Sequence, residues 1–342
     1  MIKVNVNSTD VAKLAGVSQS AVSRVFTPGA PVSAAMRDKV MRAAATLGYQ
    51  PNRLAGSLIT HRSYLIGIAI AYLGNYFYPL AVECLSRRMR QAGYQTMMFF
   101  TEPKEPADAT VEAFLQYRVD GVILASVSLS SDWVTACERA GVPVILFNRF
   151  QADPRVSTVS VDNEQGAAEV ARFLVAGGHR RIAYIAGLAG TSSQDGRESS
   201  FRRTLHTLGM PLFDRAVGDF ETEPAREAAR QLFDRPAAER PDAVFACSDQ
   251  MALAVMDVIR FELGLRVPED VSVVGFDDVP QAAWPSYDLT TVHQTIDDIV
   301  EATAGVLFER IQRPAAPPRR VQMPVSLVVR GSARIPEGDA LI

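Results

Sequence analysis

The sequence predicts an α/β protein with a small helical headpiece at its amino terminus, a short hinge, and a two-lobed body of doubly wound parallel sheets. Three observations predict this architecture: the residue pattern of positions 8–26, a change in the sign of the net charge near residue 62, and an alternation of apolar and amphipathic segments from residue 64 onward. With 342 residues, 48% of them hydrophobic, the chain can form two or three compact units with sizeable cores.

Residues 8–26 have the pattern of a helix-turn-helix. Asn7 or Ser8 can cap a first helix, and Ser18 can cap a second one. Gly16 lies between them, where the turn needs a positive φ that costs glycine little. The inward-facing positions are small or apolar, namely Val11, Ala12, Leu14 and Ala15 on the first helix and Val22 and Val25 on the second. A third helix, capped by Ser33, completes a predicted headpiece over residues 1–50.

The outer face of the second predicted helix is polar. Hydrogen-bonding side chains near a helix N-terminus can read base edges in a major groove, and a guanidinium can contact a phosphate or a guanine. The candidate DNA-binding residues on this face are Ser18, Gln19, Ser20, Ser23 and Arg24. The alternative interpretation is an amphipathic helical hairpin that only packs against its neighbours.

The charge of the chain changes along its length. Residues 1–62 contain eight Lys and Arg against two Asp, a net charge of +6. The whole chain has a net charge of −3, so residues 63–342 sum to −9. A basic headpiece on an acidic body indicates that nucleic-acid phosphates bind to the headpiece.

Residues 51–62 are predicted to be a hinge between headpiece and body. Pro51 ends the third helix, and Asn52 can cap a short helix of about two turns. With Gly56 inside it, such a helix is marginal in water and is expected to form only on DNA. Leu58 is then a candidate wedge into a minor-groove base step. The alternative is an ordinary linker in which Leu58 packs on the body.

Other features argue against several classes of protein. The chain has no apolar run of membrane-spanning length and no signal peptide at its amino terminus, so we expect a cytoplasmic protein without membrane contact. Cys84, Cys137 and Cys247 lack CxxC spacing and are expected to be reduced packing residues. The four histidines form no ligand pattern, so the sequence predicts no metal and no cofactor.

The body alternates between apolar strands and amphipathic helices. Strands are expected at 64–72, 94–101, 119–125, 142–148, 156–161, 182–187, 215–219, 242–247, 271–277, 288–293 and 321–330. Helices are expected between most of them, including 77–93, 163–177, 195–209, 249–264 and 295–312. Several strands are almost continuously apolar, which is typical of parallel strands covered on both faces. About 270 residues of this alternation suit two lobes better than one.

Polar and aromatic residues follow the predicted strands, at the edge where such sheets bind ligands. They occur in the segments Asn75-Tyr76-Phe77-Tyr78, Asn148-Arg149, Asp162-Asn163, Ser248-Asp249 and Asp277-Asp278. Together they can stack on a sugar-like ring and hydrogen-bond its hydroxyl groups. An aspartate after a strand is also a common helix cap, and this alternative applies above all to Asp249 and Asp278.

Several short motifs occur in order along the chain. They are Asp10-Val-Ala-Lys-Leu-Ala-Gly-Val-Ser18, Val22-Ser-Arg-Val25, Leu47-Gly-Tyr-Gln-Pro-Asn52, Arg118-Val-Asp-Gly121, Gly178-His-Arg-Arg-Ile182, Ser248-Asp-Gln-Met-Ala-Leu253, the segment from Leu265 to Asp278, and Leu289-Thr-Thr-Val292. In this order they resemble the lactose-repressor family of bacterial transcription regulators over essentially the whole chain.

The resemblance implies a transcription regulator, usually a repressor in this family, that binds a palindromic double-stranded DNA operator as a homodimer. Gln19, Ser20 and Arg24 would read the major groove, and paired hinge helices would insert Leu58 into the minor groove. The body is expected to have a periplasmic-binding-protein-like fold that closes on a small-molecule effector. By family position, the effector-binding residues are Phe77, Tyr78, Asn148, Arg149, Asp162, Arg197, Phe220, Ser248, Asp277 and Gln294.

The resemblance also implies how the lobes are divided. The body is expected over residues 63–342, with an N-lobe of about 63–161 plus 293–320 and a C-lobe of about 162–292 plus 321–342. The tail after Arg330 has no heptad pattern, so a tetramer built by this tail is not expected.

The effector is expected to be a sugar or a sugar acid. Arg149 and Arg197 favour an anionic ligand, whereas Asp162 and Asp277 favour a neutral one. Two other classes of protein are weighed against a regulator. One is a sugar-binding transport protein without DNA activity, and the other is an enzyme that uses the cleft. Against the enzyme, the sequence offers no nucleophile–base pair, metal set or P-loop.

Overall fold

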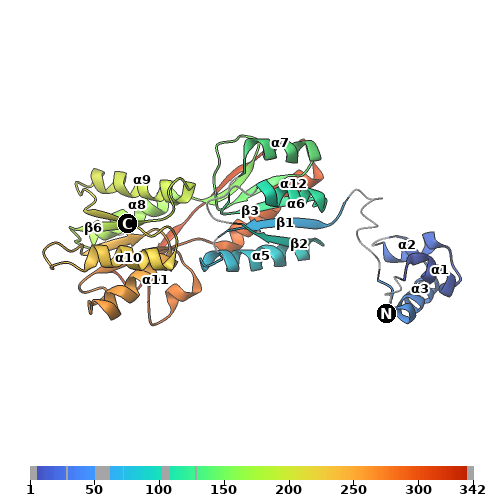
Figure 1. Cartoon of the computed structure of the whole chain (residues 1–342), viewed down its shortest axis with the longest axis horizontal. Helices are drawn as coiled ribbons and strands as arrows, with labels where there is room; N and C mark the ends of the chain where they lie inside the picture. Colours follow the sequence, from blue (N-terminus) through green and yellow to red (C-terminus); the bar gives the residue numbers. More distant parts are fainter. Residues whose placement is uncertain are drawn as a thin grey trace. The chain divides into compact units, whose positions relative to one another are not determined.

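The computed structural model describes residues 6–27, 30–50, 62–71, 73–101, 108–127 and 129–336 (Figure 1). The chain divides into two compact units, Met1–Ser63 and Tyr64–Ile342, which are the headpiece and the body. The hinge residues 51–61 lie outside the described residues, and so do the two DNA-binding candidates among them, Asn52 and Leu58.

Three helices form the headpiece: α1 (Ser8–Ala15), α2 (Gln19–Phe26) and α3 (Ala34–Leu47). Asn7 caps α1 in a reciprocal capping box with Asp10. Gly16 has a φ of 64° at the turn between α1 and α2, and the Ser18 hydroxyl accepts a hydrogen bond at the start of α2. The turn and the Ser18 cap therefore agree with the sequence prediction.

The headpiece core is small and apolar. It contains Val11, Ala12, Val22, Val25, Val40, Ala43 and Ala44. Leu14 was expected in this core, but it is 53% exposed. The buried stripe of α1 runs through Val11, Ala12 and Ala15. At 100° per residue, Leu14 lies roughly a quarter-turn outside the centre of that stripe.

The first sheet of the body has the strand order β11-β5-β4-β3-β1-β2. Its strands are β1 (Leu65–Ile70), β2 (Gln95–Phe100), β3 (Gly121–Ala125), β4 (Val144–Phe147), β5 (Ser157–Val161) and β11 (Arg320–Met323), all paired in parallel. The helices of this lobe are α5 (Phe77–Gln91), α6 (Asp108–Gln116), α7 (Ser131–Ala140) and α12 (Ile296–Gln312), and they lie on both faces of the sheet (Figure 1).

The second sheet repeats this order as β12-β10-β9-β8-β6-β7. Its strands are β6 (Ile182–Ala186), β7 (Asp214–Val217), β8 (Ala243–Ala246), β9 (Ser272–Asp277), β10 (Thr290–His293) and β12 (Ser326–Val328). Helices α8 (Asn163–Ala176), α9 (Ser192–Thr207), α10 (Thr222–Phe233) and α11 (Asp249–Asp257) flank it, together with a π-helical turn at Val258–Glu262 and a 3₁₀ turn at Pro280–Ala283.

The central strands are buried along their whole length. Every residue of β3, β4, β6, β8 and β9 is buried, as is expected when helices cover both faces of a parallel sheet. The edge strand β2 is different, since Met98 and Phe100 are 46% and 64% exposed. The doubly wound parallel architecture predicted from the apolar runs is therefore confirmed.

The chain crosses between the two sheets after β5, after β10 and after β11. One strand was expected over 321–330, but this segment forms two strands in different sheets. β11 pairs with β5, and β12 pairs antiparallel with β10. Pro324 lies between them and cannot donate a ladder hydrogen bond, so it ends the first strand. Residues 321–323 thus lie in the first sheet, not in the second lobe as expected.

No helix in the described ranges is both long and apolar enough to cross a membrane. The three cysteines are free thiols, with Cys137 and Cys247 buried and Cys84 half-buried.

Asp242 joins two strands of the second sheet at their amino ends. Its carboxylate accepts hydrogen bonds from the backbone N–H groups of Arg180 and Arg181, at 3.2 and 3.1 Å, and lies 3.3 Å from Nδ1 of the buried His179. Burial alone would raise the pKa of Asp242, but the interactions with His179 and the two backbone groups lower it to about 2.

Asp242→Asn is therefore expected to lower the free energy of unfolding by about 1–2 kcal/mol at neutral pH. Because the folded pKa of Asp242 lies below its ordinary value of 3.8, its stabilisation is present above about pH 4 and is lost as the pH falls towards 2. Urea unfolding at pH 7 and pH 3.5 measures this, with the exposed Asp234→Asn as control. An equal loss at both pH values would contradict the prediction.

Candidate functional site

The exposed face of α2 carries the predicted DNA-contacting residues. The exposed residues are Gln19, Ser20, Ser23 and Arg24, whereas Ala21, Val22 and Val25 are buried. Gln19 Nε2 donates a hydrogen bond to Ser8 Oγ at 2.9 Å, and Arg24 Nε donates to the backbone carbonyl of Ser20 at 3.4 Å. Ser18 is exposed and uses its hydroxyl as the N-cap of α2. The helix thus presents a polar face of the kind that fits a major groove.

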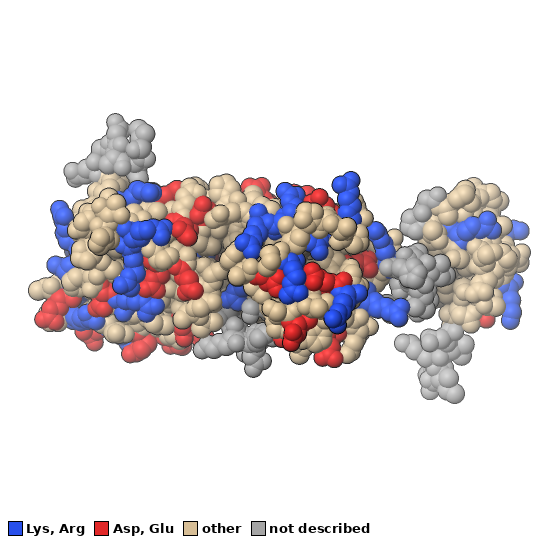
Figure 2. Space-filling model, turned by 90° about the horizontal axis from the view of Figure 1, so that it is seen from above, with Lys and Arg blue, Asp and Glu red and all other residues tan. Residues whose placement is uncertain are grey.

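The charge of the two units differs on the surface as it does in the sequence. Figure 2 shows Lys and Arg side chains mixed with Asp and Glu over the body, whereas the headpiece shows mainly basic side chains. The described headpiece contains Lys13, Arg24, Arg37, Lys39 and Arg42 against Asp10 and Asp38. Such a basic unit attracts nucleic-acid phosphates without regard to sequence.

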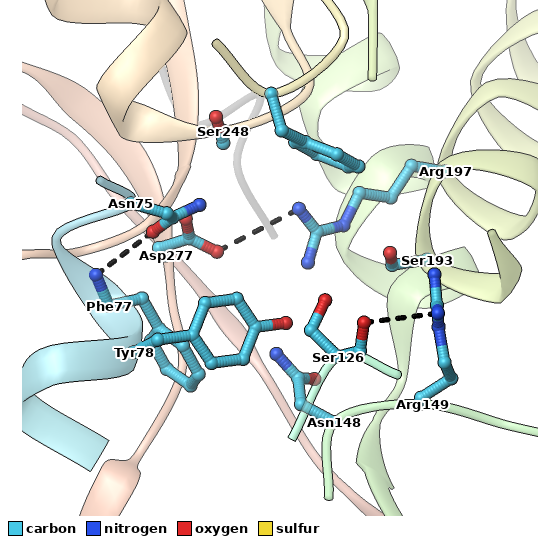
Figure 3. Close-up of a pocket in the computed structure, with 11 residues that line it drawn as sticks. Asn75, Phe77, Tyr78, Ser126, Asn148, Arg149, Ser193, Arg197, Ser248 and Asp277 are labelled. Carbon is cyan, nitrogen blue, oxygen red and sulfur yellow. Dashed lines mark hydrogen bonds and ion pairs between the residues drawn. The ribbon is translucent and has the colours of Figure 1, made fainter. Parts of the chain in front are cut away.

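A pocket of the body lies where the two sheets bring together the loops after their strands (Figure 3). The first lobe contributes Asn75, Phe77, Tyr78, Ser126, Asn148 and Arg149, and the second contributes Ser193, Arg197, Phe220, Ser248 and Asp277. The lining side chains enclose about 380 Å³ of space, part of which is open to solvent.

Four of the pocket residues have a left-handed backbone. They are Ser126, Asn148, Phe220 and Asp277, with φ values of 62°, 54°, 61° and 137°. Side-chain-bearing residues rarely adopt this conformation, which costs on the order of 1 kcal/mol or more. The surrounding sheets must hold these residues in place, and strained positions of this kind gather at binding sites.

Arg197 makes the most polar contacts in the pocket. Its Nε donates to Asn163 Oδ1 at 2.8 Å, and its Nη1 donates to the carbonyl of Cys247. The guanidinium carbon lies 3.5 Å from the centre of the Phe276 ring. Nη1 is also 3.7 Å from Asp277 Oδ1, and the Arg197 side chain is only 3% exposed. Figure 3 shows its other amino group pointing into the pocket.

Asp277 belongs to a pair of buried carboxylates. It accepts a hydrogen bond from Gln294 Nε2, while Asp249 accepts one from the Thr291 hydroxyl. Burial raises the pKa of both carboxyl groups. For Asp277, the positive charge of Arg197 opposes this rise and the charge of Asp249 adds to it. The folded protein therefore favours a proton on this pair.

Arg149 is half-buried at the side of the pocket where Ser193 and Ser126 lie (Figure 3). Its Nη1 donates to the backbone carbonyl of Ser126 at 3.1 Å. No ion pair joins it to a carboxylate in the part of the chain that the structure describes. Burial raises the pKa of the nearby Tyr78, and the hydrogen bond with Ser126 and the charge of Arg149 oppose this rise.

Aromatic rings form the apolar part of the pocket. The Phe220 ring lies directly on Gly187, where a Cβ atom would overlap it. Only glycine at this position allows the ring to approach the backbone so closely. Phe77 packs against Phe147 and meets Tyr78 edge to face, with centroids 6.4 and 5.4 Å apart. Phe220 and Tyr78 therefore provide surfaces on which a ligand ring can stack.

The structure brings eight of the ten predicted effector residues to this one pocket. They are Phe77, Tyr78, Asn148, Arg149, Arg197, Phe220, Ser248 and Asp277. Asp162 does not line it, because its carboxylate caps α8 by accepting the Gln165 N–H at 2.8 Å. Gln294 is 1% exposed and reaches the pocket only through Asp277.

The suggestion that Asp249 and Asp278 cap helices is wrong. Ser248 caps α11, while Asp249 bonds to Thr291 on β10. Asp278 accepts from Arg330 Nη2 at 2.6 Å and lies 2.8 Å from His293 Nδ1.

Sequence reasoning missed two lining residues, Ser126 and Ser193, and it named Asn75 among the polar residues after the strands without including it in the effector-binding set. Ser126 follows a predicted strand, so the rule applied to Asn148 could have identified it. Ser193 lies in the first turn of α9, which begins three residues before the predicted helix, and no local signal marked it.

Two family models match the chain. The periplasmic binding protein-like domain matches residues 171–333, and the model of bacterial regulatory proteins of the lacI family matches residues 9–52.

Similar proteins of known role cover nearly the whole chain. The ribose operon repressor of Escherichia coli (strain K12) is 33% identical over 328 residues, which is 95% of this chain and 98% of that protein. The HTH-type transcriptional regulator CelR of Thermobifida fusca is 34% identical over 331 residues, 94% of this chain and 96% of that protein.

Solved structures agree with this match. The lac repressor dimer bound to operator and the anti-inducer ONPF has a TM-score of 0.84 and 31% identity, covering 96% of this chain and 98% of that one. The CelR–cellobiose complex has a TM-score of 0.71 and 32% identity, covering 96% of this chain and 100% of that one.

Asp277→Asn is expected to make the stability of the protein less dependent on pH. Because burial raises the folded pKa of Asp277 above its ordinary value of 3.8, the wild-type protein loses stability as the pH rises from that value towards the folded pKa. An asparagine carries no such cost. Urea unfolding between pH 5 and pH 8 compares the slopes, with Asp162→Asn as control. A variant with the wild-type slope would contradict the raised pKa.

Proposed function

Because the chain belongs to the lacI family of bacterial regulatory proteins, we propose that its headpiece binds operator DNA and that a small effector in the body pocket controls this binding. It is a DNA-binding transcriptional regulator whose relatives are repressors, not enzymes. The observation that carries the proposal is the joint presence of a basic headpiece, with an exposed polar α2 face, and a body pocket lined by both lobes.

The proposed DNA contacts come from headpiece residues 1–50 and hinge residues 51–62. α2 enters the major groove with Ser18, Gln19, Ser20, Ser23 and Arg24, while the hinge contributes Asn52 and inserts Leu58 into the minor groove. The related lac repressor binds its operator as a dimer. Two copies of a weak headpiece on one palindrome bind far more tightly than one copy. Since operator DNA lies in the bacterial cytoplasm, we propose that the protein acts there, on the nucleoid.

The proposed effector is a sugar-like molecule. The ribose operon repressor carries a sugar in its name, and CelR has been solved with cellobiose. In this chain, Phe220 and Tyr78 suit stacking on a sugar ring, while Arg197, Asp277, Asn148 and Ser248 offer groups for its hydroxyls. Gln294 acts through its hydrogen bond to Asp277.

The chain crosses between the two lobes three times, and through these segments effector binding in the pocket can change DNA binding by the headpiece. A ligand held by both lobes favours one relative position of the lobes, and this position changes the spacing of the two hinge segments in a dimer. The effector must bind the DNA-competent and DNA-incompetent states with different affinities, because otherwise it shifts neither population.

Arg24→Ala is expected to weaken operator binding by about 1–3 kcal/mol, roughly 5- to 150-fold, because Arg24 is an exposed cation on the recognition face. A gel-shift titration with promoter fragments from the chain's own locus, at fixed salt, measures it. Arg172→Ala, an exposed arginine on α8 of the body, is the control for loss of one positive charge. Equal affinity of the Arg24 variant and the wild type would remove Arg24 from the DNA-binding residues.

A further inference from the structure

The body pocket carries more positive than negative charge. Arg149 and Arg197 line it, and Asp277 is the only carboxylate among its described lining residues. Arg197 lies 3.7 Å from Asp277, the one acidic side chain among the lining residues that contacts it. Arg149 donates to the neutral backbone carbonyl of Ser126, and no carboxylate in the described residues forms an ion pair with it. Within the described ranges, the positive charge of Arg149 is therefore not compensated by a carboxylate.

Two aspartates that follow strands at this edge, Asp162 and Asp249, do not line the pocket. The carboxylate of Asp162 accepts the Gln165 N–H at the start of α8. Asp249 is fully buried and is bonded to Thr291 and to the backbone N–H of Val279, at 2.9 Å for the latter. The excess of positive charge thus arises only when the chain folds, because the body as a whole has a negative net charge.

Two features beside Arg149 can contribute to ligand binding. Ser193 lies in the first turn of α9, a helix of 16 residues, and Figure 3 shows it beside Arg149. The amino end of a helix carries a partial positive charge and favours anions. Asn148 is 5% exposed, and its amide oxygen has no hydrogen-bond partner in the described structure, so this oxygen can accept a hydrogen bond from a ligand hydroxyl. Asp277 lies on the other side of the view, beside Asn75.

We propose that the effector carries a negatively charged group, a carboxylate or a phosphate ester, on a polyhydroxylated sugar skeleton, and that Arg149 selects it. This inference rests on the proposed function, since it assumes that the pocket is the effector site. The charged group binds Arg149 and the amino end of α9. The hydroxyl groups bind Arg197 and Asp277, and the sugar ring lies against Phe220.

The loss of water from Arg149 on ligand binding favours an anionic ligand over a neutral one. When a ligand fills the pocket, the guanidinium of Arg149 loses water, and a neutral sugar returns no counter-charge to it. An anion replaces the lost water with charge-assisted hydrogen bonds, which corresponds to an affinity gain of about 10- to 100-fold over the neutral parent sugar. The ribose operon repressor has a neutral sugar in its name, and CelR has been solved with the neutral sugar cellobiose, so an anionic effector would distinguish this chain from both.

The test uses calorimetric titration of the full-length protein. The probes are D-glucose, D-galactose and D-ribose, each compared with its sugar acid and its terminal phosphate ester. At least one anionic probe is expected to bind at least tenfold more tightly than its neutral parent. A preference for the acid identifies a carboxylate effector, and a preference for the ester identifies a phosphorylated one.

Arg149→Gln is expected to abolish this preference, lowering the affinity for the anionic probe at least tenfold without weakening the neutral sugar. Arg172→Gln removes the same charge from the exposed face of α8 and is expected to keep the preference. Thermal unfolding of each variant checks that the fold is retained. If no anionic probe binds more tightly than its parent, or if the preference survives in Arg149→Gln, the proposal is overturned.

Operator binding by the same preparations separates this proposal from the proposed function. Protein that binds operator and releases it with a neutral sugar, but shows no preference for anions, retains the proposed function and overturns the role of Arg149. Protein that selects an anionic sugar through Arg149, but binds no operator, supports the anion site and contradicts the proposed function.

Discussion

The buried guanidinium of Arg197 is the interaction on which the pocket depends. It joins the start of α8, the end of β8 and the end of β9 through Asn163, the Cys247 carbonyl and Asp277, and it stacks on Phe276. Burying a charge is expensive unless several partners share it. These four contacts keep the group ordered, and the carboxyl edge of the second sheet is built around it.

The residues with a left-handed backbone lie where the strands of the two sheets end. Ser126, Asn148 and Asp277 come at or directly after the ends of their strands, and Phe220 follows β7 by a few residues. A parallel strand that enters a helix within a few residues must turn sharply, and a left-handed residue makes that turn while directing its side chain outward. The cost is offset by two sheets whose central strands are completely buried. The rigid sheets thus hold the ligand-facing side chains in place on the loops that follow the strands.

The headpiece and the body differ in net charge and in the size of their hydrophobic cores. The headpiece has a small core and a net positive charge, whereas the body has a large core and a net negative charge. A small basic unit gains order from its partner DNA, and a large buried sheet pair can hold a preformed ligand site. The pocket in turn is positive within an acidic body, which shows that local charge follows from the contacts of individual side chains and not from the net charge of a domain.

Sequence by itself determined the features that depend on neighbouring residues. Asn7 and Ser18 cap helices, Gly16 makes the turn, and apolar runs form the buried strands, because caps, turns and periodicity act within a few residues. It also indicated most pocket residues, since parallel strands end at one edge.

Only the tertiary structure decided which of those side chains face the pocket. Asp162 caps its own helix, and Asp249 accepts a hydrogen bond from Thr291 on β10. Ser193 lines the pocket from the first turn of α9. Leu14 stayed exposed, and the segment after residue 320 divided between two sheets. For Asp249 and for the segment after residue 320, the partner comes from a distant part of the chain, and the packing of the sheets determines where that partner lies. Asp162 and Leu14 follow local geometry instead, a helix cap and the helical period.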